Sequence, residues 1–334
     1  MFFKDKKILI IGGTGTIGQS LLNQILLEKP KVVRIFSRDE YKQYRLQNRI
    51  GNRKDLRFLI GDVRDYDRVF SAMQDIDYVF HVAAMKHVPA CEYNPYEAVQ
   101  TNINGTYNVI KAAIAQSVTK VVFTSSDKSI SPTNTYGATK LTAEKLISAA
   151  QYSKGREKTT FASVRFGNVM GSRGSVIPLF IEQIKESKKV TVTDLSMTRF
   201  MMTLRQATTL TIKALQESKG GEVFVLKMPV IALSDLVAVV IEEACNKYNV
   251  KCDEISIEEI GLRQGEKMYE ELMTYDESTM AWELSDMFII PGIYGRQQTY
   301  LNAIKPKHGT YSSESQIPIS KEEIRKLILS EKLI

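Results

Sequence analysis

The sequence predicts a fold of the α/β class, in which a parallel, doubly wound sheet is joined by a smaller, mixed lobe toward the C-terminus. Short apolar runs alternate with helical stretches over roughly the first 170 residues. This alternation is typical of parallel strands that are connected by right-handed helical crossovers. A turn rich in glycine directly follows the first apolar run, and open sheets of this kind bind ligands at the carboxyl ends of their strands.

Six apolar runs in the first half are expected to be strands. The first, KILIIG at 7–12, stops at glycines, as a buried parallel strand does. The apolar residues between 18 and 27 then recur at helical spacing, and Pro30 ends that helix. The other strands are expected at 32–37, 56–62, 77–84, 120–126 and 159–167, and the main helices between them at 96–116 and 136–153.

The alternation loosens after about residue 170. Helices are expected near 176–187, 205–217 and 233–248, and an irregular tail beyond about 290 ends in the helix-like KEEIRKLILSEKL. We therefore expect residues 1–170 to form the core of the sheet. Residues 171–334 are expected to form mainly a ligand-binding lobe and the C-terminal tail, packed as one unit with the core.

The composition restricts the class of function. The chain is 43% hydrophobic and 25% charged, which is ordinary for a soluble globular protein. Charges of both signs alternate despite the net charge of +7, which favours a solvated surface over nucleic-acid binding. Three scattered cysteines fit a reducing cytoplasm, and three histidines leave little material for a metal site or a Ser-His-Asp triad. No apolar stretch reaches the ~18 residues of a membrane span, so we expect a cytoplasmic protein without a metal.

The turn after the first strand indicates a dinucleotide site in a Rossmann sheet. Gly12 permits a tight turn, Gly15 lets the backbone approach a pyrophosphate, and Gly18 allows the helix to pack closely on the strand. The phosphates would then lie at the helix N-terminus. A glycine turn can be only a turn, but its place between a strand and a helix supports the dinucleotide interpretation. Further cofactor contacts are expected from Thr14, Thr16 and Ile17.

The end of the second strand favours NADP over NAD. An acidic residue there would bind the ribose 2′-hydroxyl and repel a 2′-phosphate, whereas Ser37 and Arg38 can bind that phosphate. In the alternative interpretation, Arg38 is a surface residue paired with Asp39 or Glu40. Residues at the ends of the following strands are expected to complete the cofactor site, namely Asp62 and Val63 near the adenine, Ala83 and Ala84 at a close approach, and Lys86 and Ser125.

Four residues after the fifth strand carry a recognisable chemistry. Tyr136 and Lys140 are four apart and share one face of a helix. An ammonium near a phenol lowers the pKa of the phenol, so Tyr136 would be a base that removes a hydroxyl proton as hydride leaves the same carbon. Asp127 and Lys128 lie at the strand end nearest the cofactor. In the alternative interpretation, this pair is a surface ion pair in a loop.

With these motifs, the sequence resembles the extended short-chain dehydrogenase/reductase superfamily, and most closely its inverting UDP-N-acetylglucosamine 4,6-dehydratases of the pseudaminic acid type. The resemblance runs from about residue 5 to 275. It rests on GGTGTIG (12–18), FSRDE (36–40), IGDVRD (60–65), HVAAMKHVP (81–89), SSDK (125–128), NTYGATK (134–140), RFGNVMGSRGSVIP (165–178), MTRF (197–200) and LRQGEK (262–267).

The resemblance implies an NADP cofactor, a UDP-sugar substrate and a homo-oligomer, either a dimer or a hexamer. It also implies that Lys128 is the base at C5 of the sugar and Asp127 the acid at C6. Oxidation at C4 would acidify the C5 proton, and elimination of the C6 hydroxyl would follow. The family members that retain C5 stereochemistry commonly carry Asp-Glu here, so Lys128 indicates the inverting group.

The resemblance also implies a set of substrate contacts. Arginine suits a diphosphate because its forked donors match the phosphate oxygens. The residues expected to contact the substrate are Lys86, His87, Ser126, Asn168, Arg173, Val176, Thr191, Arg199, Arg263 and Glu266.

Two departures from the family pattern leave alternatives open. Ser126 replaces the usual Thr and Ser129 the usual Ala, beside the reacting carbons. A relative that only forms or only consumes the 5,6-ene intermediate would fit these changes. A UDP-hexose 4-epimerase shares the fold, the Tyr and the Lys but needs no acid–base pair at C5 and C6. A non-catalytic NADP-binding sensor would usually lose Tyr136 or Lys140.

Overall fold

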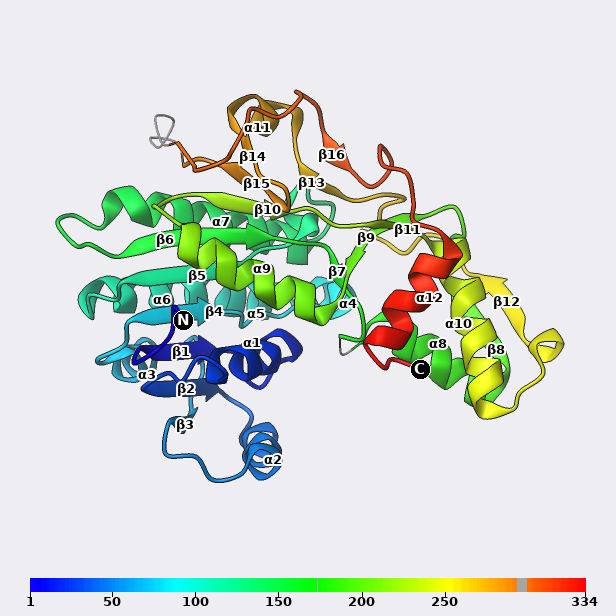
Figure 1. Cartoon of the computed structure of the whole chain (residues 1–334), viewed down its shortest axis with the longest axis horizontal. Coiled ribbons are helices and arrows are strands. Elements are labelled where there is room, and N and C mark those ends of the chain that lie inside the picture. Colours follow the sequence, from blue (N-terminus) through cyan, green and yellow to red (C-terminus); the bar gives the residue numbers. More distant parts are fainter. Residues whose placement is uncertain (173, 293–298) are drawn as a thin grey trace.

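A nine-stranded sheet forms the centre of the part of the chain that this computed structural model describes, residues 1–172, 174–292 and 299–334 (Figure 1). The strand order is β14-β15-β10-β6-β5-β4-β1-β2-β3. The strands from β3 to β10 in that order are parallel, and β15 and β14 complete one edge in antiparallel pairing. Their bounds are β1 (Lys7–Ile11), β2 (Val32–Ser37), β3 (Leu56–Ile60), β4 (Tyr78–His81), β5 (Lys120–Thr124), β6 (Thr160–Arg165), β10 (Val223–Leu226), β14 (Trp282–Glu283) and β15 (Met287–Ile290).

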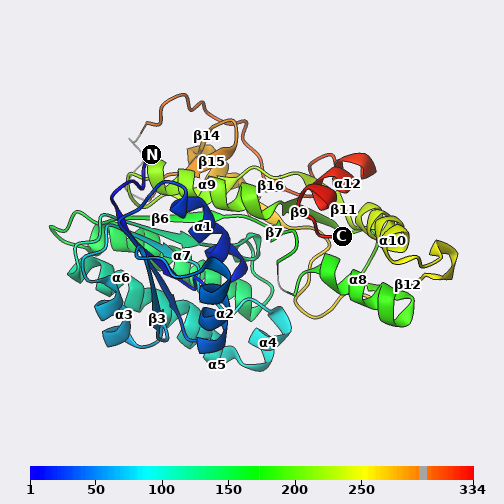
Figure 2. The same cartoon turned by 60° about the horizontal axis from the view of Figure 1, so that its bottom comes forward.

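Helices cover both faces of this sheet, as the predicted doubly wound fold requires (Figure 2). Side chains of β1 alternate between two apolar clusters: Ile8 and Ile10 pack in one, and Leu9 and Ile11 in the other. A strand that is buried on both faces reads as a continuous apolar run, which explains KILII. The helices are α1 (Thr16–Leu26) and α9 (Leu204–Glu217) on one face, α3 (Tyr66–Met73), α6 (Gly105–Ala115) and α7 (Thr135–Ser153) on the other, and α2 (Glu40–Ile50) near the β3 edge.

The helix expected at 96–116 is divided in the structure. A short helix, α5 (Pro95–Ala98), is followed by the π-helical turn η1 (Val99–Asn104) and only then by α6. Asn102 in η1 is buried, and its side-chain amide exchanges hydrogen bonds with both backbone groups of Met85. The widened turn therefore places a buried amide beside the loop that follows β4, and α4 (Val88–Tyr93) begins from that loop.

The second half of the chain forms a lobe with its own apolar core, to the right in Figure 1. Three helices supply most of that core, namely α8 (Val176–Ser187), α10 (Leu233–Tyr248) and α12 (Lys321–Ser330). Small sheets connect them, with strands β7 (Asn168–Val169), β9 (Thr198–Met202), β11 (Val230–Ala232), β8 (Lys189–Val192), β12 (Ser256–Glu259), β13 (Glu271–Met273) and β16 (Tyr311–Ser312). The remaining elements are α11 (Tyr275–Met280) and the 3-10 turns η2 (Asp127–Ser129) and η3 (Cys252–Glu254).

The expected division at residue 170 is too simple. α9, β10, β14 and β15 all come from the second half, yet they extend or cover the central sheet. Their strands are four residues or shorter, and the short strands of the lobe lie between β10 and β14 together with α10 and α11. The alternating pattern that identifies parallel strands is therefore absent where the chain returns to the core.

The six expected strands are confirmed, and five of them end earlier than their apolar runs suggest. The run at 77–84, for example, pairs only as Tyr78–His81, and the run at 120–126 only as Lys120–Thr124. The residues left beyond each strand form the loops at its carboxyl end. Of the described helices, none is long and apolar enough to cross a membrane.

Candidate active site

The glycine turn lines a cleft of about 210 Å³ at the carboxyl ends of β1, β2, β3 and β4. Gly12 has φ +87°, and a Cβ there would lie 2.7 Å from the backbone nitrogen of Ala83. A Cβ on Gly18 would lie 2.6 Å from the carbonyl oxygen of Gly12. The helix α1 begins at this turn without a side-chain cap, so its first N–H groups suit a pyrophosphate. The cradle fits a nicotinamide dinucleotide, and its lining includes Gly12, Thr14, Gly15, Ser37, Arg38, Asp62, Val63, Ala83 and Ala84.

The opposite end of this cleft is formed by the residues after β2. Arg38 is 63% exposed, and its guanidinium lies 3.9 Å from the Asp62 carboxylate, which pairs more closely with Arg64 at 2.9 Å. Asp39 caps α2 by accepting a hydrogen bond from the backbone nitrogen of Lys42, 2.9 Å away. The cation expected to bind a 2′-phosphate therefore lines the cleft, and it pairs with Asp62 rather than with Asp39 or Glu40.

Asp127 is buried at the turn after β5, with 1% of its surface exposed. Its Oδ1 accepts hydrogen bonds from the Ser126 hydroxyl and from the backbone nitrogen of Lys128, both at 2.8 Å. A Cβ on Gly167 would lie 3.1 Å from the other carboxylate oxygen and 2.9 Å from the Phe200 backbone oxygen. Glycine at 167 therefore leaves room for the Asp127 carboxylate.

Tyr136 and Lys140 are both buried on α7, as the Tyr-x-x-x-Lys spacing predicts. The Lys140 ammonium donates to the carbonyl oxygen of Thr124 at 2.7 Å and lies 4.3 Å from the centre of the Phe123 ring. Burial lowers the pKa of Lys140 to about 7. Burial raises the pKa of Tyr136 to about 12, against a hydrogen bond with Ser126 and the charge of Lys128, which lower it.

The expectation that Lys140 lowers the pKa of Tyr136 is therefore not met in this structure. The cation that acts on the phenol is Lys128. The physical reason is that Lys140 is buried against Thr124 and Phe123, whereas Lys128 turns back over the same site from η2.

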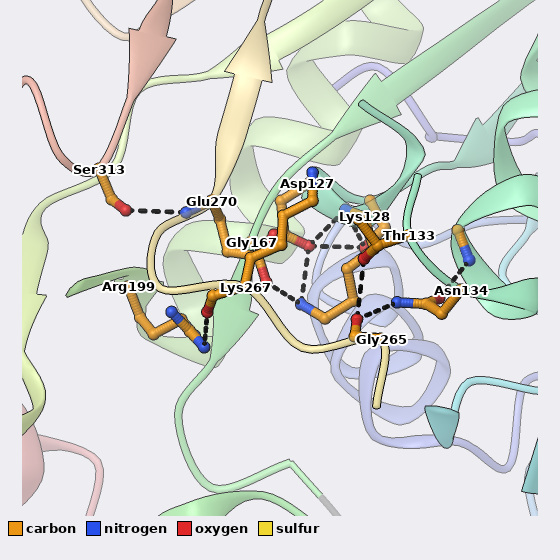
Figure 3. A network of polar contacts seen from close by, with 12 residues as sticks. Asp127, Lys128, Thr133, Asn134, Gly167, Arg199, Gly265, Lys267, Glu270 and Ser313 are labelled. Carbon is orange, nitrogen blue, oxygen red and sulfur yellow. Dashed lines mark hydrogen bonds and ion pairs between the residues drawn. The ribbon is translucent and has the colours of Figure 1, made fainter. Parts of the chain in front are cut away.

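A residue that sequence reasoning missed completes the charged group. The Lys128 ammonium lies 3.2 Å from Asp127 Oδ1 and 3.2 Å from Glu270 Oε1 (Figure 3). Glu270 is 3% exposed and comes from the segment before β13, more than a hundred residues later in the chain. It stands three residues after the LRQGEK motif. Its position close to this basic, glycine-containing motif was the one feature of the sequence that could have pointed to Glu270 as a site residue.

The segment 265–270 is hydrogen-bonded to the residues that follow η2 in the chain (Figure 3). The Gly265 carbonyl accepts hydrogen bonds from the side chains of Thr133 and Asn134, each at 2.9 Å. The Lys267 ammonium donates to the carbonyl of Ile130 at 2.9 Å. These contacts bring the LRQGEK motif and Glu270 against η2 and the residues that follow it.

The expected role of Arg199 in binding a diphosphate needs correction. Its guanidinium donates to the carbonyl oxygens of Thr198, Lys267 and Met268 at 2.8–2.9 Å. Both terminal nitrogens are used in these contacts and in one with Met197 sulfur. Arg199 therefore orders the segment that carries Glu270, because a guanidinium so engaged has little donor capacity left for a phosphate.

The other expected substrate residues are distributed over several loops. The His87 ring lies beside Gly174, where a Cβ would come within 2.5 Å of it, so the HVAAMKHVP and GSRGS loops meet. Thr191 on β8 bonds Gln183, with 2.7 Å between its hydroxyl and that amide. This pairing lies in the two-stranded sheet β12-β8 of the lobe, and the substrate role of Thr191 stays a prediction.

The remaining positions keep their status as predictions. Asn168 begins β7, Val176 begins α8, and Lys86 is exposed after β4. Arg263 is exposed, and its carbonyl accepts the backbone N–H of Glu266 at 3.0 Å. Arg173 lies outside the described residues.

Known proteins from three organisms are similar to this chain over nearly its full length. The crystal structure of Pen from Bacillus thuringiensis shares 66% identity with a TM-score of 0.95, and the match covers 100% of each chain. A protein described as an uncharacterized membrane protein from Methanocaldococcus jannaschii is 46% identical over 98% of this chain and 96% of its own. A UDP-glucose 4-epimerase from Rickettsia bellii is 40% identical over the same shares.

A more distant solved structure supports the fold, and a family model identifies the family. The dTDP-glucose 4,6-dehydratase DesIV from Streptomyces venezuelae, with NAD bound, has a TM-score of 0.70 at 19% identity, over 78% of this chain and 86% of that one. That likeness supports the Rossmann-type fold alone. The model of the polysaccharide biosynthesis protein family matches residues 8–292. The chain therefore belongs to the polysaccharide biosynthesis protein family.

Proposed function

We propose that this protein is a nucleotide-sugar 4,6-dehydratase that acts on UDP-N-acetylglucosamine with NADP and inverts the configuration at C5. The observation that carries the proposal is the buried group of Asp127, Lys128 and Glu270 beside Tyr136. The more general assignment, an enzyme of the nucleotide-sugar dehydratase and epimerase type, rests on the family match and on relatives of both kinds.

Tyr136 and Lys140 would carry out the oxidation at C4. Tyr136 would remove the C4 hydroxyl proton, assisted by the positive charge of Lys128 and by its hydrogen bond with Ser126. A nicotinamide dinucleotide held by the glycine turn, Ser37 and Arg38 would supply the hydride chemistry between C4 and C6. Both dehydratases and epimerases need this half of the site, so it does not separate the two.

Asp127 and Lys128 would carry out the elimination. A ketone at C4 acidifies the C5 proton, which Lys128 would remove as a neutral amine. Asp127 would donate a proton to the departing C6 hydroxyl, which leaves as water. Asp127 Oδ2 is buried and has no hydrogen-bond partner among the described residues. It is therefore the oxygen on which we place that proton, since Oδ1 already accepts two short hydrogen bonds.

The preference for NADP rests on the cations at the end of β2. Arg38 and Lys42 line the cleft there, and Asp39 is held as the cap of α2. Asp39 lines the cleft as well, but its carboxylate is engaged by the backbone nitrogen and the ammonium of Lys42, and the exposed Arg38 suits a 2′-phosphate.

A UDP-sugar 4-epimerase is the second candidate, because the Rickettsia bellii relative is described as one. An epimerase oxidises and reduces the same carbon and has no use for an acid–base pair at C5 and C6. The burial of two carboxylates and an ammonium in one site costs free energy, and an epimerase would gain nothing from that arrangement.

The test is incubation of the purified protein with UDP-N-acetylglucosamine and NADP in deuterated water. We expect a nucleotide sugar that has lost one water and carries deuterium at C5 in the inverted configuration. A product of unchanged mass with an inverted C4 would establish the epimerase instead. Deuterium at C5 with retained configuration would refute the inversion, and an accumulated 5,6-ene would show a partial reaction.

A further inference from the structure

The Lys128 ammonium lies between two buried carboxylates that come from distant parts of the chain (Figure 3). It lies 3.2 Å from Asp127 Oδ1 and 3.2 Å from Glu270 Oε1, and 24% of its side chain is exposed. Each carboxylate also has a buried oxygen with no hydrogen-bond partner within the described residues, Asp127 Oδ2 and Glu270 Oε2. Two full negative charges with one bare oxygen each are costly to bury, which favours a proton on the pair.

The two carboxylates differ in how strongly their surroundings favour the charged form. Asp127 Oδ1 accepts hydrogen bonds from the Ser126 hydroxyl and the Lys128 backbone, in addition to the ammonium. Within the part of the chain that the structure describes, the Glu270 carboxylate pairs with the Lys128 ammonium alone. Burial and the charge of Asp127 raise the pKa of Glu270, against Lys128 and Arg199, which lower it. When the proton of the pair lies on Asp127 Oδ2, Glu270 Oε1 is thus the oxygen left to accept the Lys128 ammonium proton, because Asp127 Oδ1 already accepts two other hydrogen bonds.

Lys128 in the resting site is a cation. Burial lowers the pKa of Lys128, but the charges of Asp127 and Glu270 raise it by more than burial lowers it. The pKa of Lys128 therefore lies above that of a free lysine. A protonated amine cannot remove a proton from C5. If Lys128 is the base of the proposed dehydration, its own proton must first move to a neighbouring group.

We propose that Glu270 is the positioning residue that receives the Lys128 ammonium proton and so releases the neutral amine that acts at C5. This inference rests on the proposed dehydratase function. The site begins with a proton on Asp127, an ammonium on Lys128 and a carboxylate on Glu270. Transfer along the 3.2 Å contact gives a neutral Lys128 and a neutral Glu270. Lys128 then takes the C5 proton as the C5–C6 double bond forms, and Asp127 gives its proton to the departing hydroxyl, so that charge and protons balance.

The backbone of Glu270 is held independently of its carboxylate. Its N–H donates to the Ser313 hydroxyl at 3.0 Å, and its carbonyl accepts the Ser313 N–H at 2.8 Å. The Ser313 hydroxyl in turn lies 2.9 Å from the Thr198 hydroxyl. Because these bonds do not involve the side chain, Glu270→Gln is expected to fold with the loop in place and to lose only the proton acceptor.

The experiment compares the wild type, Glu270→Gln and the control Glu271→Gln, all as the NADP-bound protein. The neighbouring Glu271 is partly exposed on β13 and lies outside the charged group. The first readout is the rate at which acetic anhydride acetylates Lys128 as a function of pH, measured by peptide mass spectrometry. Removing the anionic carboxylate of Glu270 should lower the midpoint of Lys128 titration by about one pH unit or more in Glu270→Gln, and the midpoint should stay unchanged in Glu271→Gln.

The second readout is a single turnover with UDP-N-acetylglucosamine. We expect C4 oxidation, followed as the rise in NADPH absorbance, to stay within about threefold in Glu270→Gln. Loss of water should slow by about 100-fold or more, which is the usual contribution of a positioned proton-transfer group. Glu270→Asp should restore part of that rate, because it again supplies an acceptor.

The outcomes separate this inference from the proposed function. Water loss at the wild-type rate in Glu270→Gln, or an unchanged Lys128 titration, would overturn the role of Glu270. The role of Glu270 would also be overturned if Glu270→Gln and Glu271→Gln both slowed the reaction and lost the same thermal stability. The effect would then be structural. A wild type that never loses water would refute the dehydratase, while the titration would still report whether Glu270 controls Lys128.

Discussion

Lys140→Met is expected to stabilise the protein at neutral pH, although it should abolish catalysis. The pKa of Lys140 falls to about 7 because the ammonium is buried on α7. At 1.36 kcal/mol for each pKa unit, that fall from an ordinary value near 10.5 means that folding disfavours the charged lysine by about 5 kcal/mol. Methionine has a similar length and no charge to bury.

The gain is reduced by the contact that Lys140 makes. Its ammonium donates to the Thr124 carbonyl at 2.7 Å, and leaving a buried acceptor without its donor costs about 1–3 kcal/mol. The net expectation at pH 7 is therefore a variant that is more stable by roughly 2–4 kcal/mol.

The stability advantage of Lys140→Met over the wild type should disappear or reverse at high pH. The unfolded chain binds more protons at this position between about pH 7 and 10.5, so wild-type stability rises with pH across that window. At pH 10 most of the charging penalty has gone, and the lost hydrogen bond should leave Lys140→Met equal to the wild type or less stable by up to about 2 kcal/mol.

Urea unfolding of the cofactor-free proteins at pH 7 and pH 10, followed by circular dichroism, measures both values. The matched control is Lys145→Met, an exposed lysine on the same helix, which should show no comparable dependence on pH. A wild type that is more stable than Lys140→Met at pH 7, or a difference that does not change with pH, would refute the reasoning.

Three further predictions concern the cofactor and the core. Gly12→Ala should weaken NADP binding by about tenfold or more in calorimetry, because the backbone has φ +87° and the new Cβ meets Ala83 at 2.7 Å. Arg38→Ala should lower the ratio of NADP to NAD affinity by about tenfold, and an unchanged ratio would remove Arg38 from the 2′-phosphate site. Arg165→Met should lower the free energy of unfolding by about 3–5 kcal/mol, because it strands the carboxylates of Glu144 and Glu277. Replacing those two glutamates by leucine as well should recover most of that loss.

The sequence predicted the N-terminal half of the fold well because its strands are buried on both faces. Such strands read as uninterrupted apolar runs, and the glycine turn and the Tyr-x-x-x-Lys pair follow them at fixed distances. The runs extended past the hydrogen-bonded ends of strands such as β4, since apolarity continues into the cleft. The return of β10 and β15 to the sheet was not predicted, because the regular alternation of apolar runs and helices stops after about residue 170.

The site was predicted in part for a related reason. Asp127, Lys128, Tyr136 and Lys140 are close in sequence, so local spacing brings them together. Glu270 joins them only through tertiary contacts of the segment 265–270, which no local pattern records. Arg199 shows the reverse error, since a cation in the MTRF motif was assigned to a ligand although it donates to backbone carbonyls.

The hydrogen bonds between segment 265–270 and the residues that follow η2 have a consequence for chimeras between this protein and its relatives. The oxidising pair Tyr136 and Lys140 comes from the first half of the chain, whereas Glu270 comes from the second. A chimera that joins the first half of this protein to the second half of an epimerase would keep hydride chemistry and exchange the partner of Lys128. Because Asp127 and Lys128 stay with Tyr136 and Lys140 in such a chimera, a graft point between residues 140 and 265 would separate these four residues only from Glu270, the proposed acceptor of the Lys128 proton.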